Sequence, residues 1–115
     1  IEIDVEAERW EDVLRWAELA LAVDPLRPAI HWSYVEAASR SGRHHKVVRG
    51  LEALAALDPV DPAEIDFRLA EAYAALERRQ LAKHHAMAAL SRAPRYREAH
   101  QLLLKLVDTS ETDEE

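Results

Sequence analysis

Six histidines are the residues of this sequence best suited to bind a metal ion. Two histidines on one helix share a metal when they stand three or four residues apart, because both rings then lie on one face. The pairs His44–His45 and His84–His85 are adjacent instead, so their side chains diverge by about 100° on a helix. We therefore predict no metal site within a single helix, and we expect His31 and His100 to be packing residues. A site built from distant residues stays open.

The other reactive side chains fit no catalytic pattern. The sequence has no cysteine, no serine flanked by glycines and no glycine-rich phosphate loop. Acid pairs such as Glu8 and Asp12 are expected on solvated helix faces, whereas a catalytic carboxylate needs a pocket that shifts its pKa. We predict no enzymatic activity and no cofactor within this sequence, although an enzyme in a longer parent protein is compatible with it.

The charges argue against nucleic acid as a partner. Basic residues gather near residues 40–49, 78–83 and 92–97, which suits either a nucleic-acid stripe or solvated helix rims. The formal net charge is −7, and a phosphate backbone would be repelled by it, so the rims are favoured. No apolar run approaches about 18 residues, so we predict no membrane insertion.

Apolar residues at helical spacing predict an all-α chain of six helices. These should cover, in order, residues 7–23, 28–41, 44–57, 62–76, 79–93 and 95–107. The only glycines are Gly42 and Gly50. A glycine inside a helix costs up to about 1 kcal/mol relative to alanine. We therefore expect another helix to lie against Gly50.

The two ends of the sequence differ from its middle. Residues 1–6 alternate apolar and acidic side chains and are predicted to be an extended linker, either a tail lying on the first helix or a strand remnant of an upstream domain. Residues 108–115 are acidic and without apolar side chains, which predicts a disordered, solvated terminus rather than an interaction tail. Because the chain starts at Ile1 without a methionine, we interpret it as a fragment of a longer protein.

Prolines mark an internal period. Pro25, Pro59 and Pro94 stand 34 and 35 residues apart, which indicates a helical repeat array. The segment from residue 63 resembles a tetratricopeptide repeat, a helix-turn-helix of about 34 residues. The matches to the family pattern are Leu69, Ala70, Tyr73, Ala82, Ala89 and Pro94. Asp66 replaces the usual tryptophan and Glu77 the usual glycine, whereas Gly42 matches that glycine in a more degenerate repeat from residue 28. The resemblance implies a right-handed α-α superhelix of helical hairpins over residues 7–107.

The resemblance also implies a ligand surface, because the first helix of each repeat lines a concave groove in that family. The positions carried over are Trp32, Glu36, Ser39, Arg40, Phe67, Arg68, Glu71 and Gln101. Members that bind a terminal carboxylate have Lys and Asn where this chain has an aromatic residue and a glutamate. Such a pair suits an apolar or cationic peptide. Alternatively, Trp32 and Phe67 pack against a neighbouring helix and the glutamates are solvated.

These expectations favour a non-enzymatic module that binds a protein or peptide. Two alternatives stay open. The chain is a structural docking domain at the C-terminus of a larger multidomain bacterial protein, such as a peptidase, or it forms a homodimer through the exposed face of its first helix. Neither the partner nor the cell compartment follows from the sequence.

Overall fold

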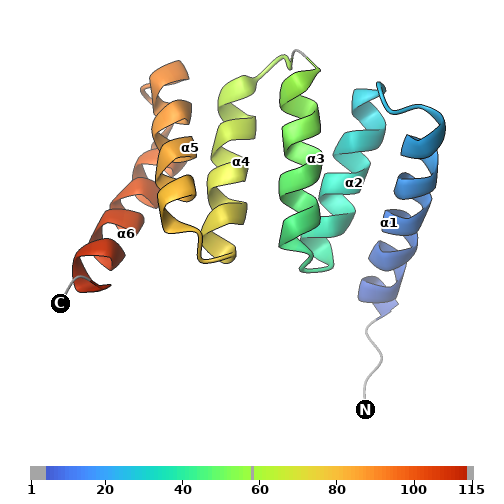
Figure 1. Cartoon of the computed structure of the whole chain (residues 1–115), viewed down its shortest axis with the longest axis horizontal. Helices are drawn as coiled ribbons and strands as arrows, with labels where there is room; N and C mark the ends of the chain where they lie inside the picture. Colours follow the sequence, from blue (N-terminus) through green and yellow to red (C-terminus); the bar gives the residue numbers. More distant parts are fainter. Residues whose placement is uncertain (1–4, 58, 114–115) are drawn as a thin grey trace. The chain divides into compact units, whose positions relative to one another are not determined.

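The computed structural model describes the backbone of residues 5–57 and 59–113 and the side chains of residues 8–57 and 59–107. Within these ranges the protein is all-α, with six helices and no strand (Figure 1). The helices are α1 (Val5–Val23), α2 (Pro28–Arg40), α3 (His44–Ala56), α4 (Pro62–Ala75), α5 (Arg79–Arg92) and α6 (Arg97–Asp113). They form two compact units, a first unit with α1 to α3 and a second unit with α4 to α6.

Proline and a capping carboxylate set the start of two helices. Pro28 and Pro62 are the first residues of α2 and α4, where the missing amide hydrogen costs no hydrogen bond. The Asp61 side chain accepts a hydrogen bond of 3.2 Å from the Glu64 amide, which satisfies one free donor of the first turn of α4. These signals are local, and the sequence therefore predicted both starts.

The same backbone turn closes the α2–α3 and α4–α5 hairpins. Gly42 has a φ of 71° and Glu77 a φ of 59°, so both lie in the left-handed region. In each turn the amide of the following residue donates to the carbonyl five residues earlier, at 2.8 Å. This pattern is a common way to end a helix. Each unit therefore contains one hairpin closed in the same way, although only the first has a glycine there.

In the first unit α2 contacts both α1 and α3. The buried apolar residues of the first unit are Leu14, Ala17, Tyr34, Val35, Ala37, Ala38, Val47, Val48, Leu51 and Leu54. A Cβ atom at Gly50 would lie 2.6 Å from Val35 Cγ2 and 2.9 Å from Tyr34 Cδ2. The predicted contact of another helix with Gly50 is thus confirmed, and the missing side chain allows it.

The second unit has a core made largely of alanine. Helix α5 contacts α4 and α6, and α6 also contacts α4. Seven of the ten buried apolar residues described in this unit are alanines, against three of ten in the first unit. Ala70 and Ala82 are both fully buried. Such small side chains let helix backbones approach closely, as the sequence predicted for these two positions.

The proline connections before α2 and α6 share one contact. His31 Nε2 donates to the Pro25 carbonyl at 2.7 Å, and His100 Nε2 donates to the Pro94 carbonyl at 2.8 Å. His31 is buried and His100 is exposed. Both rings therefore hold a connection between helices, and only His31 is a packed histidine of the kind predicted.

The described helix ends agree with the predicted ones to within two residues except at the C-terminus. Helix α6 continues to Asp113, six residues beyond the predicted end, because no proline or glycine interrupts residues 108–113. At the other end α1 already includes Val5, which was expected to be extended. The tail predicted at residues 1–4 and the last two residues lie outside the described part. The superhelix of hairpins stays a prediction.

Candidate functional site

Two aromatic rings meet on the second unit. Phe67 on α4 and Tyr96, which precedes α6, have ring centroids 5.1 Å apart and planes tilted by 36°. Both side chains are half-buried, so part of each ring is open to solvent. Phe67 thus packs against a neighbouring aromatic residue and still contributes to the surface.

Carboxylates surround the Tyr96 phenol. Its pKa is raised, first by desolvation and then by the negative charges of Glu64, Glu98 and Asp61, while Arg68 lowers it. Arg68 itself donates through Nε to Glu64 Oε1 at 3.3 Å, which offsets one of these charges. Three of the four charged groups that act on the phenol are therefore carboxylates.

We call the two rings and the carboxylates of Asp61, Glu64 and Glu98 the acidic aromatic patch. Glu71 lies one helical turn beyond Phe67 on α4, on the same face. Desolvation raises the pKa of Glu71, and the nearby Arg68 charge opposes this. Gln101 is exposed on α6. Its part in a shared site stays a prediction.

The residues predicted on the first unit form a separate group. Arg40 on α2 lies over the Trp10 ring of α1, 5.4 Å from its centroid, and donates through Nε to Glu36 Oε1 at 3.1 Å. The Trp10 contact joins α2 to α1, whereas the ion pair with Glu36 lies within α2. Trp32 is half-buried and Ser39 exposed.

Asp66 is a central residue of the α4–α5 hairpin that the sequence did not indicate. It accepts from His85 Nδ1 at 3.2 Å and from Arg92 Nε at 3.0 Å. The His85 ring stacks on Tyr73 with centroids 5.4 Å apart. Since the Asp66 side chain is 15% exposed, these contacts matter more than surface ion pairs do. We interpret the cluster as a cross-link between the helices.

Metal binding has no preformed site in the described residues, where no group of three or more potential ligands occurs.

Sequence spacing did not indicate Tyr96 or Asp66, because each of them contacts residues that are distant along the chain. Asp66 is far from its partners along the chain, and Tyr96 meets Phe67 only through the fold. The clues in the sequence were an aromatic residue in a polar turn and an acidic residue where the tetratricopeptide pattern has tryptophan.

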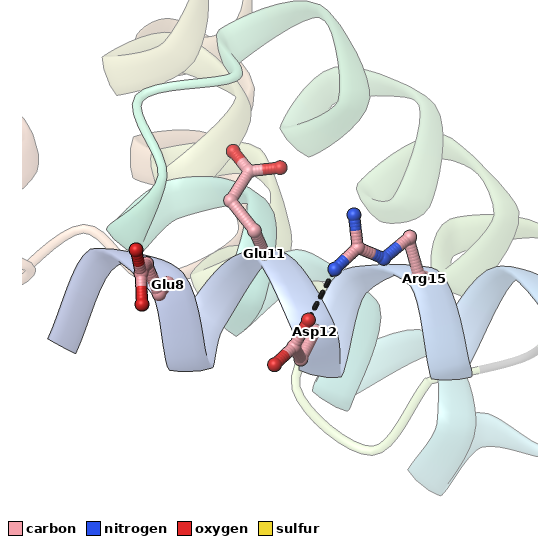
Figure 2. A pocket seen from close by; sticks show the side chains of 4 residues that line it. All are labelled: Glu8, Glu11, Asp12 and Arg15. Carbon is pink, nitrogen blue, oxygen red and sulfur yellow. Dashed lines mark hydrogen bonds and ion pairs between the residues drawn. The ribbon is translucent and has the colours of Figure 1, made fainter. Parts of the chain in front are cut away.

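A surface hollow of about 460 Å³ lies on α1, lined by Glu8, Glu11, Asp12 and Arg15. Figure 2 shows all four side chains projecting from this one helix, with Arg15 turned toward Asp12 to form an ion pair. Glu11 also accepts from Arg43 at 3.1 and 3.2 Å. Three of the four charged side chains that line the hollow are therefore paired, and the hollow is solvated surface of the kind predicted for Glu8 and Asp12.

Neither a family model nor a curated protein matches the chain. The tetratricopeptide resemblance therefore rests on the residues themselves. In the described part, every helix is too short or too polar to cross a membrane.

Proposed function

We propose that the chain is a tetratricopeptide-like module that binds peptides, and that the acidic aromatic patch is its ligand surface. The observation that carries the proposal is the half-exposed Phe67–Tyr96 pair with carboxylates around it. An exposed aromatic surface offers apolar contact, while the carboxylates accept charge-assisted hydrogen bonds. The ligand chemistry that fits is a peptide with apolar and basic side chains.

The repeat character of the chain is supported by features that recur at the repeat period. Gly42 and Glu77 both place a left-handed residue at the hairpin turn, where the related family usually has glycine. Ala70, Ala82 and Ala89 are fully buried at positions where that family has small residues. These are the contacts that a repeat of helical hairpins requires.

The expected affinity is low. Burying one leucine on the rings is worth about 1.5–3 kcal/mol, and two exposed ion pairs add about 0.2–1 kcal/mol each. The total of at most about 5 kcal/mol corresponds to a dissociation constant of about 0.2 mM or weaker. Such binding is measurable by NMR titration.

The experiment compares two peptides on the isotope-labelled 115-residue chain. One alternates leucine with lysine and the other leucine with glutamate, so that apolar content is the same and charge is reversed. We expect the lysine peptide to shift the amide signals of Phe67, Tyr96 and their neighbours. The glutamate peptide should leave them unchanged, because the patch repels it.

Charge-reversal variants locate the surface without disturbing the rings. Glu98→Lys should weaken binding of the lysine peptide, because it replaces an attractive charge with a repulsive one. Glu52→Lys makes the same change at an exposed position of α3 and should bind as the wild type does. Equal binding of both peptides, or shifts confined to other residues, would refute the proposal.

A further inference from the structure

Helices α1 and α6 each carry exposed apolar side chains at helical spacing. On α1, Trp16, Leu19 and Val23 are 58%, 72% and 87% exposed, and their spacing places them on one stripe. On α6, Leu104 and Val107 are 65% and 37% exposed. Large exposed apolar groups at helical spacing indicate a docking surface rather than scattered surface residues.

Internal repetition identifies what would cover the α1 stripe. The contact of a histidine with a proline carbonyl occurs after α1 and again, 69 residues later, after α5. Helix α1 therefore corresponds to α5, and Trp16 and Val23 correspond to His85 and Arg92. Both of these bind Asp66 of α4. The α1 stripe is thus the surface on which a helix like α4 packs in the second unit.

The same correspondence identifies what is missing from α6. Helix α6 follows its histidine connection as α2 does, so Leu104 corresponds to Val35. Val35 is 1% exposed, because it packs where α3 carries Gly50. Likewise Val107 corresponds to the fully buried Ala38. The exposed side of α6 is therefore the surface on which a helix like α3 packs in the first unit.

We propose that α6 of one copy of the chain docks on α1 of a second copy. By this correspondence α6 has the position of the first helix of a hairpin, and α1 has the position of the second helix of a hairpin. Together they form one hairpin-like pair across two molecules, continuing the packing already made between α1 and α2. This contact is head-to-tail, so it leads to a ring or to an open chain of copies.

The size of the two surfaces predicts weak association. At these exposures the five side chains offer roughly 600 Å² of apolar surface, about half of the ~1,200 Å² that small specific interfaces bury in total. Polar neighbours must supply the rest. Trp16 stands 34 residues, one repeat, before Gly50, and Leu104 corresponds to Val35. Because Trp16 and Leu104 are larger than these counterparts, the docked helices should lie further apart than α2 and α3.

Sedimentation of the 115-residue chain from micromolar to millimolar concentration tests the proposal. We expect the average mass to rise with concentration. Trp16→Glu and Leu104→Glu each place a charge on one surface, and each variant alone should associate at least about 30-fold more weakly. Met87→Glu changes a side chain that is 60% exposed on α5 and belongs to neither stripe, so this variant should associate as the wild type does.

Mixing the two variants provides the decisive result. Trp16→Glu keeps an intact α6 surface and Leu104→Glu keeps an intact α1 surface, so the mixture should form a one-to-one dimer that cannot extend. Circular dichroism of each variant checks that its helices are intact. A wild type that stays monomeric overturns the proposal. Association of Leu104→Glu alone also overturns it, because that result indicates a symmetric α1–α1 dimer.

Discussion

Gly50→Ala tests whether close helix contact outweighs helix propensity. Alanine in place of glycine inside a helix gains about 1 kcal/mol from propensity alone. The added Cβ would lie 2.6 Å from Val35 Cγ2 and 2.9 Å from Tyr34 Cδ2, and both neighbours are buried and unable to move freely. Overpacking of this kind costs about 1–3 kcal/mol. We therefore expect no gain, and a net destabilisation of up to about 2 kcal/mol.

Urea unfolding followed by circular dichroism measures this change. The matched control is Ala55→Gly, the reverse exchange at an exposed position of the same helix, which should cost about 1 kcal/mol by propensity alone. The double variant with Val35→Ala removes the nearest clashing atom. Its loss should be smaller than the sum of the two single losses by about 0.5–3 kcal/mol.

Stabilisation by Gly50→Ala would refute this reasoning. It would show that α2 and α3 lie further apart than described, or that α3 shifts at little cost. Additive effects of Gly50→Ala and Val35→Ala would contradict it as well, since residues without contact show no coupling.

Three further predictions concern the second unit. Glu77→Gly should stabilise the chain by about 0.5–1 kcal/mol in urea unfolding, because glycine relieves a left-handed backbone at a φ of 59°; an unchanged midpoint would argue against that backbone. Asp66→Ala should cost about 1–3 kcal/mol, because it removes both contacts of a largely buried carboxylate and leaves the half-buried His85 ring without this partner. Arg92→Ala should cost less than about 1 kcal/mol because Arg92 is 55% exposed; equal losses would contradict the central role of Asp66. Desolvation raises the pKa of Glu71 above its ordinary value, so its ionisation destabilises the fold. Glu71→Gln should therefore be more stable than the wild type at neutral pH, and the gain should be lost as the pH falls through the raised pKa toward the ordinary value of 4.5. A gain that persists in acid would exclude ionisation as its cause.

Local signals explain why the helices were predictable. Proline at the start of α2 and α4, and glycine after α2, act within a few residues. Gly50 inside α3 lowers the stability of that helix, so its presence indicated a closely packed neighbouring helix. The prediction for α6 is too short because residues 108–113 have no apolar side chains. An apolar stripe shows where a helix packs and not where it stops.

The candidate site depended on contacts that sequence spacing does not show. Phe67 was selected through the family resemblance, but its partner Tyr96 belongs to another helix connection. Asp66 and His85 meet only because α4 and α5 fold back on one another. The sequence spacing also did not show that Arg40 lies over Trp10; its place on a ligand surface stays a prediction. Pairs between elements require the fold itself.

The alanine-rich interior of the second unit has a thermodynamic consequence. Alanine removes little hydrocarbon from water, whereas the leucine, valine and tyrosine side chains buried in the first unit remove much more. The heat capacity change of unfolding grows with the apolar area exposed. The second unit should therefore have the flatter stability curve, and cooling should weaken the first unit more.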